Sequence, residues 1–377
     1  DFSSLTTSPW RDLPAAVDLA GHLVTDLEKG HLQLNSQNGK IDYSSMFRDK
    51  IELSKLEGDI YWQNTTEGWQ VDIPGLHASN ADITLDTRLS MLLPEEGAPY
   101  IDLVGYFHDG DGKNTSKYLP VAVIPDDAVA WLDKAIVQGK VTQGGIIVHG
   151  SMDDFPFDHG EGKFEVRFDV QNGILDYQPG WPALKDINAE VVFSGRGMKI
   201  TSEHGFILSS EIKNMSVDYT DMTADIPDLN IKGLLDVKTT DVLEYVISSG
   251  IGKEYQKTLE RLQAKGSGEL ELALHLSLGE AEDHLSGRMR FDDNIISLRE
   301  SDVALHKFNG QVGIVDGQFW GEDLHAQLLG EALDIRVEPG KSADVALSIE
   351  ANTRLDLNKN LRKHIGKSIP NIMSGKS

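Results

Sequence analysis

The sequence contains no cysteine, which excludes disulfide bonds, thiolate nucleophiles and cysteine-based zinc sites together. It has no apolar run near 18 residues and no signal peptide, so it predicts no membrane-spanning helix. The chain lacks a starting methionine, begins at Asp1 and stops at Ser377 in mid-pattern. We therefore expect a piece of a longer protein, with any membrane anchor lying outside it.

Basic residues are scarce. Lys and Arg number 35 against 60 Asp and Glu, for a net charge of −25. Such a chain repels phosphate backbones, which makes nucleic acid an improbable partner, and no polybasic patch attracts it to anionic lipid. Apolar residues make up 40% and charged residues 25%, as in folded proteins. Because 377 residues exceed one ordinary core, we expect two or three domains or a repeating array.

Known catalytic motifs are missing as well. The sequence has no Gly-x-Ser-x-Gly elbow, no Walker loop and no His-Glu-x-x-His. Carboxylates are so frequent that no pair stands out as a general acid and base. The sequence therefore predicts no enzyme, no cofactor and no metal. A carbohydrate-active β-enzyme would need a carboxylate pair in a cleft, which the pattern does not reveal.

Two stretches have metal-ligand residue types. The first is a cluster of five possible metal ligands: His149, Asp153, Asp154, Asp158 and His159. We prefer to interpret this cluster as a polar turn around Phe155-Pro156-Phe157. The other, His108 to Asn114, resembles the start of a calcium loop but lacks a Glu at the twelfth position. A hairpin turn is the simpler interpretation of this second stretch.

Strict alternation of apolar and polar residues is the strongest signal. It runs through Lys163–Val170, Glu269–Leu278, Leu285–Asp292 and Leu56–Gln63. A period of two gives each strand one buried and one wet face, which is typical of antiparallel sheets. We count roughly twenty such segments. Turn signals separate them, among them Asn172-Gly173, Ser194-Gly195 and Asp316-Gly317.

Helical segments are few. We expect one from Asp126 or Asp127, as the cap, through Val137, with Gly139 just beyond its end. Three more are predicted over Asp241–Ser248, Lys253–Lys265 with Gly266 as the stop, and Leu357–Ile365. From Lys359 onward the sequence has basic residues and no acidic ones. This end is either a small helix packed on a sheet, which we prefer, or a helix lying on a membrane surface.

The elements repeat. A helix, a glycine and a strand occur around Gly139 and again around Gly266, and a last helix leads toward Gly375, where the chain stops before the expected strand. The hairpin over residues 188–200 resembles those over 309–320 and 56–71. The order predicts β-rich units joined end to end, as in a solenoid. We place them at 1–120, 121–238 opened by a short helix, 239–356 opened by helices, and a truncated start at 357–377.

Several short pieces, weak singly but specific in order, resemble the AsmA-like envelope proteins and particularly the YhdP family. The resemblance spans nearly the whole chain and is clearest over about residues 50–300. The pieces are Tyr118-Leu119-Pro120, Trp131-Leu132, Gly139, Phe155-Pro156-Phe157, Gly162-Lys163-Phe164, Tyr177 to Leu184, and Phe193 to Met198.

The resemblance implies a mainly β fold: an elongated, highly twisted antiparallel sheet curled into an apolar groove, built of repeated units with a few short helices. It implies a non-enzymatic, periplasmic segment of a longer protein anchored in the inner membrane. The groove would carry phospholipid acyl chains between inner and outer membranes and so support the outer-membrane barrier. Alternation phase selects its lining: Ile60, Trp62, Phe164, Val166, Phe168, Val191, Phe193, Leu270, Leu272, Leu274, Leu276, Met289 and Phe291.

Alternation alone also fits a β-sandwich, whose apolar face meets a second sheet. In that case the chain is a structural or partner-binding array with a closed core. A charge placed at an inward position separates the two, because an unpaired charge unfolds a packed core but not an open groove.

Overall fold

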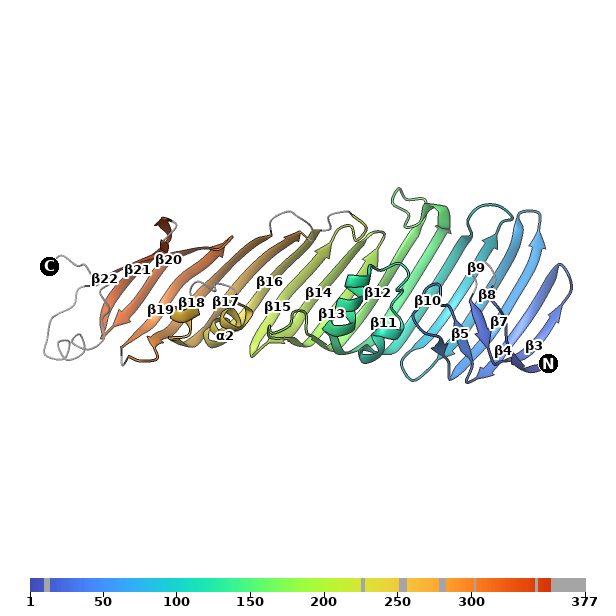
Figure 1. The fold of residues 1–377 in the computed structure, drawn as a ribbon, viewed down its shortest axis with the longest axis horizontal. Coiled ribbons are helices and arrows are strands. Elements are labelled where there is room, and N and C mark those ends of the chain that lie inside the picture. Colours follow the sequence, from blue (N-terminus) through green and yellow to red (C-terminus); the bar gives the residue numbers. More distant parts are fainter. Residues whose placement is uncertain are drawn as a thin grey trace. The chain divides into compact units, whose positions relative to one another are not determined.

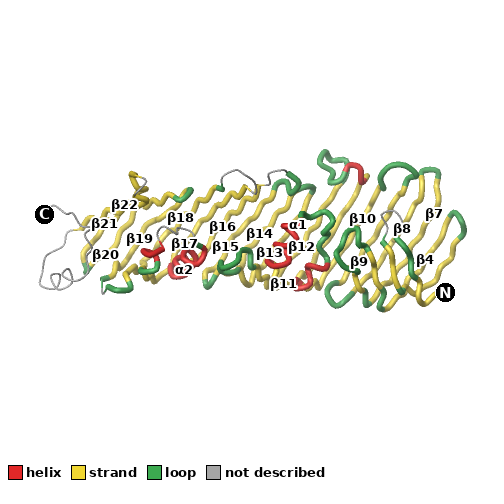
Figure 2. The backbone as a smooth tube through the Cα atoms, in the orientation of Figure 1, coloured by secondary structure: helices red, strands yellow, loops and turns green. Residues whose placement is uncertain are grey.

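The computed structural model describes residues 1–9, 14–224, 228–250, 256–277, 283–301, 303–342 and 345–353. Strands make up 66% of these described residues, and their helices are few and short (Figure 1, Figure 2). The predicted mainly β, antiparallel fold is confirmed. Within the described part of the chain, no helix has the length and apolar character needed to cross a membrane.

The chain packs as two compact units. The first comprises Asp1–Pro179, Ala183–Gly205 and Val217–Pro227, and the second Gly180–Pro182, Phe206–Ser216 and Asp228–Ser377. The four-part division predicted from the sequence stays a prediction.

The strands up to residue 194 lie in the first unit. They are β1 Phe2–Leu5, β2 Ala15–Val17, β3 Leu19–Thr25, β4 Lys29–Gln37, β5 Lys40–Asp42, β6 Ile51–Glu52, β7 Lys55–Thr65, β8 Gly68–Ser79, β9 Thr84–Leu93, β10 Tyr100–Asp111, β11 Ile136–Ser151, β12 Lys163–Leu175 and β13 Leu184–Ser194.

Two further strands divide between the units, and the rest lie in the second. These are β14 Gly197–Ile207 and β15 Ser210–Tyr219, then β16 Asp228–Lys238, β17 Leu262–Ser277, β18 His284–Leu298, β19 Ala304–Val315, β20 Gln318–Leu328, β21 Glu331–Ser342 and β22 Val345–Thr353. The helices are η1 Gly112–Lys117, α1 Asp126–Ala135, η2 Met152–Asp154, α2 Thr239–Ser249 and α3 Gln256–Leu259.

Nearly all strands pair with their neighbours in sequence. In the first unit the order is β1-β3-β4-β7-β8-β9-β10-β11-β12-β13, and in the second β16 to β22 follow one another. They belong to one open antiparallel sheet of 19 strands. Strands β2, β5 and β6 form a separate three-stranded sheet. Each strand therefore depends mainly on its two neighbours.

The alternating segments become strands as predicted. Lys163–Val170 lies in β12, Leu56–Gln63 in β7 and Leu285–Asp292 in β18, while Glu269–Ser277 completes β17. The charged positions of β18 are exposed, whereas Met289 is buried. In β18 the period of two has therefore produced one apolar and one polar face.

The first predicted helix is shorter than expected. Helix α1 ends at Ala135, because Ile136 already pairs with Leu175 as the first residue of β11. Pro125 occupies the N-cap, and no side chain caps the helix, so the capping role predicted for an Asp was wrong. The β-branched Ile136 and Val137 gain more from sheet pairing than from one more helical turn.

The second predicted helix is present as α2, which ends at Gly250 in the left-handed conformation. The third was largely wrong: α3 covers Gln256–Leu259 only, and β17 begins at Leu262. Gly266 is not a helix stop but lies within β17, where a Cβ atom would clash with Asn294 Oδ1. Residues 251–255, 357–365 and the basic end lie outside the described residues.

Turn signals succeeded at hairpin ends and failed inside strands. Ser194-Gly195 and Asp316-Gly317 join β13 to β14 and β19 to β20. Asn172-Gly173, predicted as a turn, is a bulge inside β12. Asn172 keeps its left-handed backbone because its N–H donates to Asn188 Oδ1 at 3.2 Å, on the next strand.

The same bulge recurs further along the chain. Asp293 is also left-handed, and its N–H donates to Asn309 Oδ1 at 2.9 Å. Asn172 and Asp293 are as far apart in the sequence as their acceptors, Asn188 and Asn309. The same interval relates two further pairs of left-handed residues, Asp186 with Lys307 and Leu208 with Leu329. The sequence repeat thus has a repeated backbone geometry.

The stretch over His108–Asn114 is not a hairpin turn. Residues up to Asp111 continue β10, and the 3₁₀ helix η1 follows directly. Asp111 caps that helix, since its Oδ1 accepts a hydrogen bond from Lys113 N at 3.0 Å. A carboxylate engaged in this way serves the local fold.

Candidate functional site

One face of the first unit carries apolar rows that cross the strands. Val166 lies between Ile146 on β11 and Phe193 on β13, and Phe168 lies opposite Val191. These pairs share one side of the sheet because directly opposed residues face the same way. The structure therefore brings together four of the predicted lining residues of this region.

The rows continue beyond the predicted residues. Phe164 pairs with Val148, which pairs with Leu103 and, through it, with Leu89 on β9. Sequence reasoning did not select these partners. In Ile146-Ile147-Val148 both faces are apolar, so alternation gave no phase there. The strand register supplies the information that the pattern lacked.

Aromatic rings are concentrated on this part of the face. The ring of Phe168 lies 6.3 Å from that of Phe107 and 6.4 Å from that of Phe193. The half-exposed Phe155, from the loop after η2, lies 5.2 Å from Phe164. These side chains remain half-buried, with their remaining surface in solvent.

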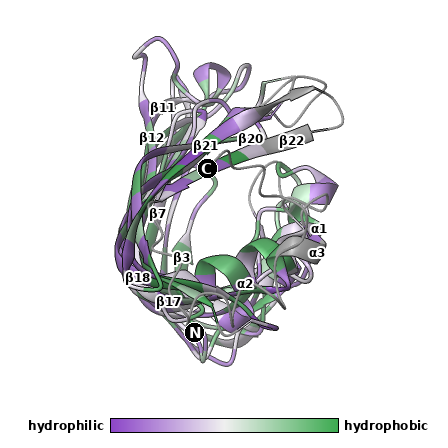
Figure 3. Cartoon of the chain, turned by 90° about the vertical axis from the view of Figure 1, so that its left-hand side faces the viewer, coloured by the Kyte–Doolittle hydropathy of each residue, from purple (hydrophilic) through white to green (hydrophobic). Residues whose placement is uncertain are grey.

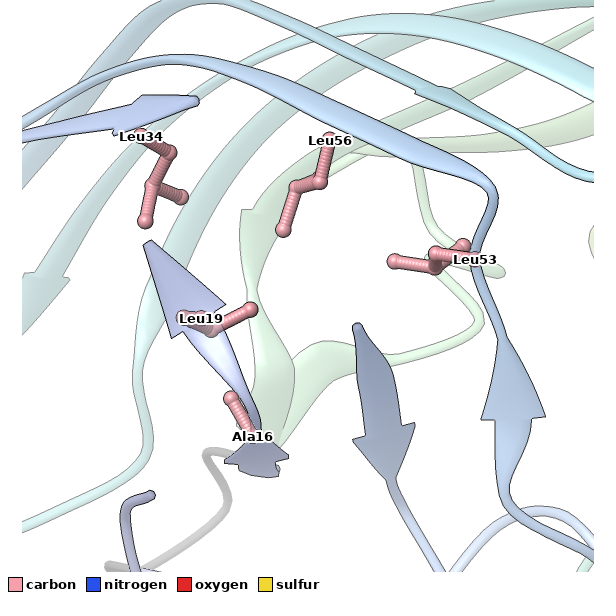
Figure 4. Close-up of a cluster of buried hydrophobic side chains, with 5 residues drawn as sticks. All are labelled: Ala16, Leu19, Leu34, Leu53 and Leu56. Atoms are coloured by element: carbon pink, nitrogen blue, oxygen red, sulfur yellow. The ribbon is translucent and has the colours of Figure 1, made fainter. Parts of the chain in front are cut away.

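The other end of the first unit is closed. Figure 4 shows Ala16, Leu19, Leu34, Leu53 and Leu56, which form a buried cluster. It joins β3, β4 and β7 to the three-stranded sheet that carries Ala16. Leu19, Leu34 and Leu56 are each 4% exposed. We call this cluster the closed patch.

Of the two predicted lining residues of β7, only Ile60 lies beside the closed patch. Ile60 packs against it and is opposite Leu32 in the register. Trp62 lies opposite Gly30, and its ring occupies the space that a side chain at Gly30 would fill. Ile60 thus lies at the covered end of the apolar face, and Trp62 is two residues further along the same strand.

The second unit repeats the arrangement on β16, β17 and β18. Leu270 lies between Leu235 and Met289, and Leu274 lies between Ile231 and Leu285. Leu276 pairs with Leu229. Phe291 pairs with Gly310 and packs, with Phe308, into a second buried cluster.

Leu272 has a different environment. Its register partners are Gly233 on β16 and Gly287 on β18, so no side chain flanks it. A Cβ at Gly287 would meet Ile314 at 3.4 Å, and the backbone oxygen of Glu271 and the side chain of Leu272 at 3.9 Å. The three residues help to line an open hollow of about 520 Å³. Sequence analysis did not anticipate it, because the two glycines look like interruptions of the pattern.

Helix α2 is held against the sheet by buried polar groups. It contacts β16 and β17, and its ribbon has largely the hydrophobic colour in Figure 3. Burial would raise the pKa of Asp241. Hydrogen bonds from Ser209 and Ser210 to its carboxylate outweigh that effect and hold the pKa below its usual value. Thr239 donates to the buried Asn294.

A second polar network fixes η1 in the first unit. Asp82 accepts hydrogen bonds from Asn114, Lys117 and Tyr118 at 2.9, 2.8 and 3.1 Å. Burial, and then the neighbouring Asp82, raise the pKa of Tyr118 to about 12. A phenol with that pKa stays protonated and serves as a structural donor.

The opposite face of the sheet is polar, and charged side chains on it pair with one another across neighbouring strands. Arg290 donates to Glu269 across β17 and β18 at 2.9 Å, and Arg288 donates to Glu271 beside it. In the first unit, His77 lies 2.8 Å from Asp86 on the next strand. Exposed pairs of this kind contribute about 0.2–1 kcal/mol each, so their main effect is to keep the face hydrated.

The cluster considered as a metal site is spread out. His149 lies within hydrogen-bond distance of Tyr100, and Asp158 accepts from Arg196 at 2.5 Å. Across the described residues, no group of three or more His, Asp or Glu side chains converges to hold a metal ion. Asp158 instead joins the loop after η2 to the β13–β14 turn.

The sequence is similar to that of a known bacterial protein. The chain is 24% identical over 359 residues to a protein of Escherichia coli (strain K12) described as "Intermembrane phospholipid transporter YhdP", covering 93% of this chain and 28% of that protein. The chain thus spans about a quarter of its relative. No solved structure matches it. The family model described as YhdP protein matches residues 1–377, and the chain therefore belongs to the YhdP family.

Proposed function

We propose that this chain is a non-enzymatic segment of a path for phospholipid between the inner and outer membranes, and that its apolar face carries the acyl chains. The observation that carries the proposal is the series of apolar rows that the register produces in each unit, through Phe168 in the first and Leu274 in the second. The relative's transport function supports the same proposal.

The energetics suit an acyl chain. Burial of each CH₂ group stabilises binding by roughly 0.8 kcal/mol, so a chain of many methylenes is held by surface contact alone. A row of similar side chains, such as Leu235, Leu270 and Met289, offers apolar contact on successive strands. Apolar contact without a specific head-group site favours movement, because it is not directional.

The polar face suits the place we propose, the aqueous periplasm. Charged side chains such as Glu269 and Arg290 keep the outside of the sheet wet. Transport of this kind breaks no covalent bond in the lipid. The segment then needs neither a cofactor nor a catalytic residue.

A second function, a structural or partner-binding array with a closed core, is favoured by the closed patch. Leu34 and Leu56 there are buried as in an ordinary protein core. The half-buried Phe164 and Val166 argue for the lipid path on β12.

The test is photocrosslinking of the purified chain after expression in a Gram-negative bacterium. A photoreactive residue replaces Phe168 or Leu272 on the apolar face, and matched controls replace Arg167 or Glu271, their sequence neighbours on the opposite face. We expect phospholipid adducts from the first pair, identified by mass spectrometry, and at least tenfold fewer from the second. Equal yields from both pairs, or no adduct from either, would overturn the proposal.

A further inference from the structure

The closed patch lies on the same apolar row as Phe168. The strand register joins the two through one series of opposed residues on one side of the sheet: Leu56, Ala78, Leu85, Phe107, Gly144 and Phe168. Leu56 is 4% exposed, whereas Leu85 and Phe107 are half-buried. An acyl chain on Phe168 therefore has before it an apolar row that ends beneath a cover.

The cover consists of the folded-over ends of the strands that it covers. Strand β2 is joined to β3 by Asp18 alone. Two residues join β4 to β5, and two join β6 to β7: Asn38-Gly39 and Leu53-Ser54. These corners lie side by side, because β3, β4 and β7 are neighbours in the large sheet and β2, β5 and β6 in the small one. Hinges are typically a few such residues at the ends of elements.

The small sheet is braced within itself. Lys40 donates to Glu52 at 2.7 Å across β5 and β6. Lys50 Nζ, from the connection between these strands, lies 3.0 Å from Asp42 Oδ2. We call β2, β5, β6 and the connection over residues 43–50 the flap. Its internal pairs favour movement of the flap as one body.

Two contacts hold the flap beside its corners. Asn80 Nδ2 donates to Glu52 O at 2.8 Å. Thr7 and Ala16 exchange hydrogen bonds at 2.8 and 2.9 Å. Glu52 and Ala16 lie within two residues of a corner, where a hinged body moves least.

The tip of the flap, at the far end of β5 and β6 from the corners, is held by α1 and the segment before it. Arg48 donates to both carboxylate oxygens of Asp133, at 3.0 and 3.4 Å. Ala122 N donates to Met46 O at 3.4 Å. The side chains of Arg48 and Asp133 are 36% and 30% exposed, so water can replace the pair. Pairs that reach solvent in this way hold weakly.

The surface beneath the flap is apolar. The flap contributes Ala16 and its corner contributes Leu53 to the closed patch, with Ile41 and Ile51 packed beside them (Figure 4). Burial of apolar surface is not directional. A methylene chain can therefore replace these side chains on the sheet and leave no polar group there without its partner.

We propose that the flap is a hinged cover released when Arg48 leaves Asp133, and that an acyl chain then takes its place on Leu19, Leu34 and Leu56. The inference rests on the proposed function, which it extends from the Phe168 row to the closed patch. Flap and acyl chain compete for one apolar surface. Lipid that arrives along the row therefore shifts the flap toward its open state by mass action.

The experiment measures lipid crosslinking at two leucines of one row, in the full chain expressed in a Gram-negative bacterium. A leucine-sized diazirine residue replaces Leu56, beneath the flap, or Leu85, further along the row. Arg48→Glu places two carboxylates opposite each other at the tip. We expect phospholipid adducts at Leu56 to rise roughly fivefold or more, and those at Leu85 to change less than about twofold.

Two variants are matched controls. Arg48→Asp combined with Asp133→Arg restores opposite charges and should return the adducts at Leu56 to their original level. Arg167→Glu breaks the pair with Glu190 on the polar face of the same unit and should leave both leucines unchanged. Hydrogen exchange of β3, β4 and β7 distinguishes opening of the flap, which keeps their amides protected, from unfolding.

The tip can also be closed chemically, because the chain has no cysteine of its own. Arg48→Cys with Asp133→Cys, joined by a short cleavable bismaleimide, should give roughly fivefold fewer adducts at Leu56 than the same chain before joining. Cleavage of the linker should restore them. This comparison decides alone if Arg48→Glu unfolds the main strands.

The inference is overturned if Leu85 captures phospholipid while Leu56 responds neither to Arg48→Glu nor to the linker. It is equally overturned if Arg167→Glu raises the adducts at Leu56 as much as Arg48→Glu does. Absence of adducts at both leucines in every variant overturns the proposed function, and the inference falls with it.

Discussion

The closed patch and the rows around Phe168 belong to the same unit and use the same kind of strand, yet they are buried to different extents. Leu34 and Leu56 are 4% exposed beneath the three-stranded sheet, whereas Phe164 and Phe168 are half-buried. The strands alone therefore do not decide whether an apolar face becomes a core. What decides it is whether a second element packs on that face.

Leu56→Asp should have the largest effect. The carboxylate would be placed in the closed patch without a partner, and we expect a loss of roughly 3 kcal/mol or more, enough to unfold that part of the unit. Urea unfolding measures the loss. Leu56→Ala separates the cavity contribution, expected at about 2–5 kcal/mol, from the cost of the charge. A fully folded Leu56→Asp chain would show that the patch is not a core.

Asp241→Asn tests how firmly helix α2 is held against the sheet of the second unit. The amide keeps the shape but loses charge-assisted hydrogen bonds from Ser209 and Ser210, so α2 should be destabilised by about 1–3 kcal/mol. Hydrogen exchange of the α2 amides reports it. Because the folded pKa of Asp241 is lowered, its contribution is present above the unfolded pKa and is lost as pH falls through the folded value. The variant should lack that acid-dependent step.

Phe168→Asp is the counterpart of Leu56→Asp at a half-buried position. The carboxylate can reach water there, so we expect a stability loss of about 1–2 kcal/mol, smaller than at Leu56. Lipid capture should nonetheless fall sharply, because the charge interrupts the apolar row. Urea unfolding together with lipid quantification tests both parts. Unfolding as complete as that of Leu56→Asp would show that these rows are also a closed core.

Gly287→Leu should have the smallest effect on stability, within about 1 kcal/mol, since a Cβ there meets Ile314 at 3.4 Å, an ordinary contact. The added side chain fills the hollow beside Leu272. Crosslinking from Leu272 to lipid should then decrease, while crosslinking from Phe168, in the other unit, serves as the internal control. Unchanged adducts at Leu272 would mean that the hollow is not part of the lipid path.

Alternation predicted most of the fold because it is a local property that survives in any antiparallel sheet. It identified the strands of Phe168 and Leu272 and the face on which those residues lie. It failed where distant pairing overrides a local preference. Leu262 fits a helical pattern with Tyr255 and Leu259, but pairing with Leu298 draws it into β17.

The sequence pattern could not show which element covers an apolar face, or which distant residues become neighbours across strands. The strand β2 has only three residues, so nothing in its length marked it as part of the cover on Leu34. Leu85 and Phe107 do not stand out in the sequence, and only the register of β9 and β10 makes them partners. The significance of Gly287 likewise depends on lying opposite Leu272.

The recurring bulge at Asn172 and Asp293 allows such a chain to gain or lose residues in whole repeats. Each bulge is satisfied by the very next strand, and each strand bonds chiefly to its sequence neighbours. Duplication or loss of one full interval therefore leaves every remaining hydrogen bond with an equivalent partner. The number of strands can therefore change in whole repeats, and each bulge that remains still finds its acceptor on the next strand.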